Sequence, residues 1–208
     1  MKKTKTLGKS LFLFNTSQQY NYETLILGCR YFAFELCAAN LQDWAAAKFN
    51  GAVPDQLIGL HQLASGLAFV HDKQHVHRDI CPRNILISAL GDRLIISDFG
   101  LCKRGHDNGS NSVSNRRGHE KWLSPERIVK RYDPNYRMTI DSDTWAMGCT
   151  FYFFITKGSH PFDDKDLFEM LKKVNEGNSN LEGKFLLHSR RSSNPLIQLN
   201  RFVCRKTW

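Results

Sequence analysis

The chain has 208 residues and a formal net charge of +9, a length that predicts one mid-sized domain. With 41% hydrophobic and 24% charged residues, its composition is that of a globular protein and excludes a disordered or disulfide-dense chain. The basic surplus lies in residues 1–10 (+4) and 183–208 (+6), so residues 11–182 sum to −1. A basic pI often indicates nucleic-acid binding. Because the surplus lies in the two ends and residues 11–182 are nearly neutral, we expect no direct nucleic-acid binding here.

Apolar stretches such as 11–14 and 151–155 are far shorter than the roughly 20 residues that a membrane-spanning helix needs. We therefore expect no membrane span, and no secretory signal because the apolar run after the first lysines stops too early. The six cysteines are scattered and form no C-x-x-C pair. This pattern favours reduced thiols in a cytosolic compartment over a disulfide framework or a zinc site.

The first predicted elements are a strand and two helices. Residues 30–37 are apolar and aromatic and predict a strand. Asn40 is a typical N-cap, so a helix over 41–47 is expected to follow. A longer helix is predicted from Pro54, a residue tolerated in a first helical turn. Its apolar stripe, at i, i+3, i+4 spacing, comprises Leu57, Leu60, His61, Ala64, Leu67 and Val70.

Two further elements are predicted downstream. The short apolar runs 85–87 and 94–96 have the spacing of a β-hairpin. The apolar stretch 145–155 is long enough to favour a buried helix over a strand, with Trp145 and the aromatic residues of 151–154 in the core.

Polar residues with a characteristic spacing flank the predicted hairpin. His77-Arg78-Asp79 is followed by Asn84 five residues after the aspartate, and Asp98-Phe99-Gly100 begins fourteen residues after the asparagine. The hairpin would bring Asn84 and Asp98 to the same end of two paired strands. A carboxylate and an amide oxygen on adjacent loops can share a Mg²⁺ ion.

These motifs are protein-kinase signatures: H-R-D-x-x-x-x-N, D-F-G and, at 124–126, Ser-Pro-Glu as a variant of A-P-E. Residues 35–42, 84–88, 96–103 and 158–162 resemble the kinase domain of the inositol-requiring enzymes, endoplasmic-reticulum stress sensors that join a kinase to an endoribonuclease. The resemblance covers residues 30–163. It implies an α+β, protein-kinase-like fold, mostly the helical C-terminal lobe with its hinge.

The resemblance also implies a domain layout and a location. Residues 30–182 would form a partial kinase domain, 1–29 an unmatched segment with any remnant of the small lobe, and 183–208 an unmatched basic tail. The location implied is the cytosolic face of the endoplasmic-reticulum membrane.

The resemblance implies an ATP- and Mg²⁺-dependent serine/threonine protein kinase. Asp79 would accept or orient the proton of the substrate hydroxyl, and Asn84 and Asp98 would hold Mg²⁺ against the triphosphate. Asp143 would hold the backbone of the catalytic loop. Partners would be a protein substrate, the chain itself by autophosphorylation, and a second copy in a homodimer.

Three residues are assigned to the adenine site by the same resemblance. Glu35 and Cys37 would present backbone groups to adenine at the hinge, and Leu86 would form the floor beneath it. The alternative for these residues is simple strand packing.

The chain departs from the family pattern at catalytic positions. Cys81 stands where these kinases usually have a lysine, and Arg83 is the candidate catalytic residue that replaces this cation at the transferred phosphate. The alternative is that Arg83 is a solvated loop residue. His119 stands where the family usually has threonine, so substrate positioning at this point is expected to differ from that of the family.

The region upstream of the hinge lacks two kinase features. Its only glycines are Gly8 and Gly28, so it has no G-x-G-x-x-G loop, and it has no V-A-I-K-like lysine. The N-terminal lobe is therefore expected to be largely missing. Two hypotheses follow: an active kinase domain, or a pseudokinase or truncated module that acts by binding or dimerisation.

Between Asp98 and Glu126 lies the expected activation segment. Ser110, Ser112 and Ser114 are candidate autophosphorylation sites, where a phosphate could pair with Arg78 and order the loop. The alternative is a flexible polar loop.

Overall fold

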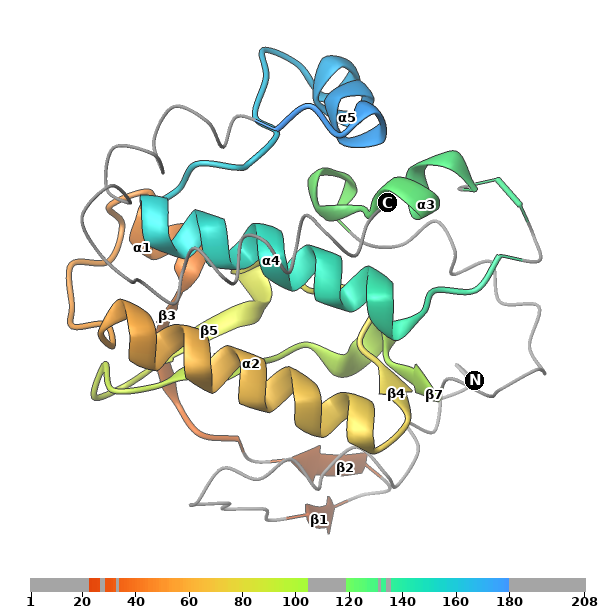
Figure 1. Ribbon diagram of the computed structural model, residues 1–208. Coiled ribbons are helices and arrows are strands. Elements are labelled where there is room, and N and C mark those ends of the chain that lie inside the picture. The colour runs from red at the N-terminus through yellow and green to blue at the C-terminus, as the bar shows by residue number, and fades with distance from the viewer. Residues whose placement is uncertain are drawn as a thin grey trace.

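The computed structural model in Figure 1 describes residues 23–26, 29–32, 34–104, 119–130, 132–133 and 136–179. Its main helices are α2 (Gln56–Asp72) and α4 (Ile140–Thr156), which pack against each other. The shorter helices are α1 (Leu41–Ala45), α3 (Pro125–Val129) and α5 (Leu167–Glu176). No helix in these ranges is long and apolar enough to cross a membrane.

Within the described residues, the strands form three small antiparallel sheets. One pairs β1 (Glu23–Ile26) with β2 (Cys29–Phe32). The second has the order β3-β5-β6, with bounds Cys37–Asn40, Ile85–Ser88 and Leu94–Ile96. The third pairs β4 (His75–Val76) with β7 (Lys103–Arg104). The described chain is therefore a mixed α+β structure in which helices predominate.

The single strand predicted over 30–37 is wrong. Strand β2 ends at Phe32, β3 begins at Cys37, and 34–36 belong to neither. The strands belong to different sheets, because β2 pairs with β1 whereas β3 pairs with β5. Between them Phe34 and Leu36 are 74% and 83% exposed, so this apolar run does not mark one buried strand.

The capping role of Asn40 is confirmed, since its Oδ1 accepts a hydrogen bond from the Asp43 N–H at 2.9 Å. The helix that it caps is shorter than predicted. Helix α1 ends at Ala45, and Ala47 has a left-handed φ of +57°, which a continuing helix does not allow.

The long helix exists, but its start and its buried face differ from the prediction. Asp55 is the N-cap, so Pro54 precedes the helix instead of occupying its first turn. The face turned to the core centres on Gly59, where an added Cβ would lie 2.7 Å from a ring carbon of Phe154. The helix therefore buries Gly59, Leu60, Leu63, Leu67 and Val70, while Leu57, His61 and Ala64 are exposed.

The hairpin and the buried helix are both confirmed. Strands β5 and β6 pair with Ile85 opposite Ile96, and Ile85 and Ile87 are fully buried. Trp145 and the four aromatic residues of 151–154 are all less than 10% exposed in α4. Helices α2 and α4 and this hairpin share one core. The loops just before β5 and just after β6, at one end of the hairpin, are therefore held in place.

Candidate active site

The loop that carries Asp79 is anchored by a buried carboxylate. Asp143 lies in the first turn of α4 and is 1% exposed. Its carboxylate accepts hydrogen bonds from the backbone N–H of His77 at 2.7 Å and from the backbone N–H of Arg78 at 2.8 Å. The prediction that Asp143 holds this backbone is therefore confirmed. The sequence did not reveal a third partner, the His71 ring, whose Nε2 lies 3.1 Å from the same carboxylate.

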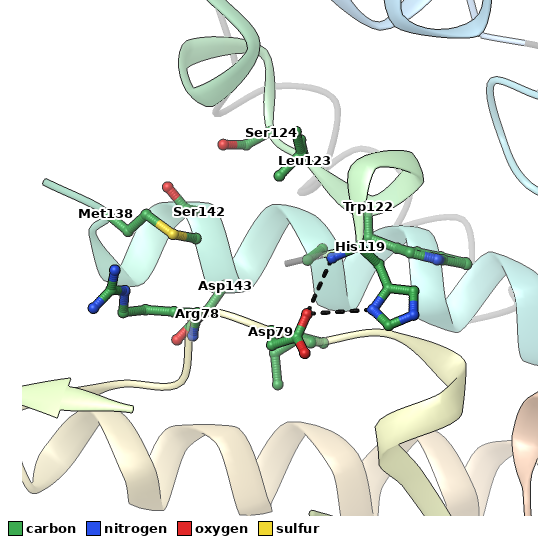
Figure 2. Close-up of a pocket in the computed structure, with 11 residues that line it drawn as sticks. Arg78, Asp79, His119, Trp122, Leu123, Ser124, Met138, Ser142 and Asp143 are labelled. Carbon is green, nitrogen blue, oxygen red and sulfur yellow. Dashed lines mark hydrogen bonds and ion pairs between the residues drawn. The ribbon is translucent and has the colours of Figure 1, made fainter. Parts of the chain in front are cut away.

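Two residues of the site have left-handed backbone conformations. Arg78 has a φ of +73° and Asp98 a φ of +59°, which cost of order 1–3 kcal/mol each for residues other than glycine. The Asp143 hydrogen bond holds Arg78 in this conformation, and the Oδ1 of Asp98 accepts from the Gly100 N–H at 3.2 Å. Figure 2 shows Arg78 and Asp79 with their side chains pointing in different directions, along the pocket beside α4.

Asp79 and Asn84 meet directly. The Nδ2 of Asn84 donates to the backbone oxygen of Asp79 at 2.8 Å and to its Oδ2 at 3.0 Å. Asn84 is buried in the 3₁₀ turn Pro82–Asn84, which leads into β5. Because the amide nitrogen is engaged with Asp79, the amide oxygen is the atom of Asn84 able to ligate a cation.

Asp98 lies at the same end of the hairpin as Asn84, as the sequence predicts. The backbone oxygen of Asn84 accepts from both the N–H and the Oγ of Ser97, at 2.8 and 2.9 Å. Asp98 follows Ser97 and is exposed. The two adjacent loops thus offer a carboxylate and an amide oxygen, ligands that suit Mg²⁺.

The predicted hinge residue Glu35 contacts the hairpin through a partner that sequence reasoning missed. The Glu35 carboxylate accepts from the Arg93 guanidinium at 2.6 Å, which joins the segment before β3 to the turn between β5 and β6. Burial raises the pKa of the Cys37 thiol, so this side chain stays protonated at neutral pH.

Leu86 and Arg83 lie within two residues of Asn84. On β5, Leu86 stands between the fully buried Ile85 and Ile87 and, because side chains alternate along a strand, faces away from their core. Leu86 is half-buried. Arg83 is exposed.

The two departures from the family pattern meet at Asp79. The backbone N–H of His119 donates a hydrogen bond to the Asp79 Oδ1 at 3.2 Å, and the ring Nδ1 of His119 lies 3.6 Å from the same oxygen (Figure 2). The Cys81 Sγ lies 3.8 Å from that Nδ1, and burial raises the pKa of this thiol to about 11. Since these residues are 38 apart in the sequence, only the fold reveals the contact.

The three candidate phosphorylation sites, Ser110, Ser112 and Ser114, lie outside the described residues. The Ser-Pro-Glu motif lies within them. Glu126 accepts hydrogen bonds from Ser124 at 2.5 Å and from Ser142 at 2.9 Å. The end of the expected activation segment is thereby attached to the first turn of α4.

The family of the chain follows from comparison with known proteins. A model of the protein tyrosine and serine/threonine kinase family matches residues 29–185, so the chain belongs to the protein kinase family. The predicted kinase-like fold, mostly the helical lobe, is confirmed.

Its relatives are named as kinase/endoribonucleases. The serine/threonine-protein kinase/endoribonuclease ireA of Aspergillus fumigatus is 33% identical over 195 residues, 74% of this chain and 17% of that protein. The corresponding proteins ire-1 of Caenorhabditis elegans and IRE2 of Homo sapiens are 37% and 40% identical, over 70% and 64% of this chain. The chain spans only 15–17% of these relatives, and it is a serine/threonine kinase domain related to theirs.

Proposed function

We propose that this chain transfers the γ-phosphoryl group of ATP to serine or threonine hydroxyls of proteins. The observation that carries the proposal is the Asn84 side chain bound to Asp79, with Asp98 at the same end of the hairpin. Asp79 accepts or orients the hydroxyl proton, while Asn84 and Asp98 are the Mg²⁺ ligands. Bound Mg²⁺ would neutralise charge on the phosphates. By family resemblance, the substrates include the chain itself and the location is the cytosolic face of the endoplasmic-reticulum membrane.

We assign adenine to the hinge, with backbone groups of Glu35 and Cys37 as its polar contacts and Leu86 as its floor. The ion pair between Glu35 and Arg93 supports this assignment, because it fixes the hinge relative to the hairpin that carries Leu86. Preorganisation of this kind lowers the entropic cost of binding.

Mg²⁺-ATP is expected to raise the melting temperature of the full chain. At ten times its Kd, a ligand stabilises the native state by about 1.4 kcal/mol, or about 3–6 °C for a chain of this size. Asp98→Asn should reduce the Mg²⁺-dependent part of this shift, whereas Asp72→Asn, at the exposed end of α2, should not. The absence of any shift at millimolar Mg²⁺-ATP would contradict nucleotide binding.

Arg83→Ala is expected to lower kcat for phosphotransfer roughly tenfold, about 1.4 kcal/mol of transition-state stabilisation. The reason is that the exposed guanidinium supplies the cation that Cys81 does not. Incorporation of labelled phosphate into a generic protein substrate measures this effect. The matched control is Arg104→Ala, which removes another exposed arginine, and Asp79→Asn gives the background. An unchanged kcat would leave Arg83 as a solvated loop residue.

A second candidate function is a kinase-like binding module without catalysis. It is favoured by the His119 backbone and ring, which lie against the Asp79 oxygen that would receive the proton. Nucleotide binding without phosphate incorporation would favour this module over the kinase.

A further inference from the structure

The only group of three or more cysteine, histidine and acidic side chains with metal-ligand spacing among the described residues is Asp79, Cys81 and His119. Their ligand atoms lie within 4.8 Å of one another. We propose that these three side chains form a Zn²⁺ site, distinct from the Mg²⁺ ligands, and that Zn²⁺ bound there occupies the Asp79 carboxylate.

The distances fit a tetrahedral ion. Zn²⁺ binds sulfur at about 2.3 Å and nitrogen or oxygen at about 2.0–2.1 Å, which separates neighbouring ligand atoms by about 3.3–3.6 Å. Two of the three separations are 3.6 Å, from the His119 Nδ1 to the Asp79 Oδ1, and 3.8 Å, from the Cys81 Sγ to that Nδ1, and all three ligand atoms lie within 4.8 Å of one another. Small side-chain rotations would therefore bring the three atoms onto one ion, with water at the fourth position.

The donor set selects the metal. Thiolate and imidazole ligands favour Zn²⁺, whereas carboxylate and amide oxygens suit Mg²⁺. Asn84 and Asp98 offer only oxygen atoms as ligands. Cys81 and His119 offer sulfur and nitrogen next to Asp79. Binding displaces the Cys81 thiol proton to the buffer as the sulfur–zinc bond forms, and His119 binds through the lone pair of Nδ1.

The surroundings supply orientation and access. The Asn84 amide holds the second oxygen of Asp79 at 3.0 Å, which leaves Oδ1 directed at His119. Hydrogen bonds of this kind to a ligating carboxylate strengthen metal sites. The His119 side chain is 33% exposed and the Asp79 side chain 12% exposed, so an ion can reach the site from solvent. Cys81, which is 1% exposed, forms the buried side of the site.

Occupation of the site has a functional consequence that rests on the proposed kinase activity. An Asp79 oxygen bound to Zn²⁺ cannot accept the substrate proton. Micromolar Zn²⁺ would then inhibit phosphotransfer even at saturating Mg²⁺, and a chelator would restore it.

The test is metal binding by the full, reduced chain, with Co²⁺ as a spectroscopic probe and Zn²⁺ in competition with a chromophoric chelator. We expect one tetrahedral Co²⁺ per chain with a thiolate-to-cobalt charge-transfer band, displaced by Zn²⁺. Cys81→Ser should abolish the band, and His119→Asn should weaken Zn²⁺ binding at least tenfold. The matched controls Cys102→Ser and His75→Asn, a half-buried cysteine and histidine, should leave both unchanged.

Each outcome decides the proposal. A band that persists in Cys81→Ser, or that disappears in Cys102→Ser, would overturn it, as would the absence of stoichiometric binding by the parent chain. Circular dichroism of each variant confirms that the fold is retained. If the parent chain binds one ion through Cys81 but transfers no phosphate without it, the metal site stands and the proposed kinase activity fails.

Discussion

Asp143→Ala is expected to lower the free energy of unfolding by about 3–5 kcal/mol, the cost of removing one partner from a buried charged network. The carboxylate accepts from the backbone N–H groups of His77 and Arg78 and contacts the His71 ring. Alanine would leave the two N–H groups buried without acceptors, and unsatisfied buried groups cost about 1–3 kcal/mol each. The loss should also release the left-handed conformation of Arg78.

Urea denaturation of the parent chain and the variant measures this effect. Asp141→Ala is the matched control, because Asp141 lies in the same first turn of α4 but is exposed; it should change stability by less than about 0.5 kcal/mol. Asp143→Asn retains one acceptor oxygen and should fall between the two. Equal stabilities of Asp143→Ala and Asp141→Ala would contradict the anchoring role.

Stability is expected to fall as the pH is lowered from 7 to 5, and His160 should account for about 2 kcal/mol of the loss. Burial, aided by the nearby Lys121 ammonium, lowers the pKa of His160 from 6.5 to about 3. The imidazole is thus neutral in the native state but protonated in the unfolded chain below pH 6.5. The unfolded state binds more protons, so the stabilising effect of a neutral His160 is lost as the pH falls from 6.5 towards 3.

His160→Gln removes this titration and should flatten the dependence of stability on pH between 7 and 5. The exposed His61→Gln variant is the matched control and should keep the parent slope. Buried His77, whose pKa burial also lowers, is retained in both variants, so only the difference between the slopes reports on His160. Identical slopes for the two variants would contradict the prediction.

The parts of the fold that local patterns encode were predictable. The β5–β6 hairpin follows from two short apolar runs and a turn, and α4 follows from an apolar stretch too long for a strand. Asn40 caps α1 through a side chain suited to that role. The placement of Asn84 and Asp98 followed as well, because the outer ends of the two strands of an antiparallel hairpin lie side by side.

Other features depended on neighbours distant in the sequence. The buried face of α2 is the one where Gly59 admits Phe154, a contact that apolar spacing along α2 does not encode. The break between β2 and β3 reflects two different pairing partners. The ion pair between Glu35 and Arg93 joins residues 58 positions apart.

The sequence by itself determined the family, the residues of the phosphoryl-transfer motifs and the position of the basic surplus in the two ends, because these are properties of residue type and spacing. Only the tertiary structure decided what surrounds Asp79. Cys81 and His119 are separate departures from the family pattern in the sequence, yet the fold brings both against one carboxylate. Side-chain chemistry depends on distances of a few ångströms, and for residues far apart in the chain those distances are set by packing.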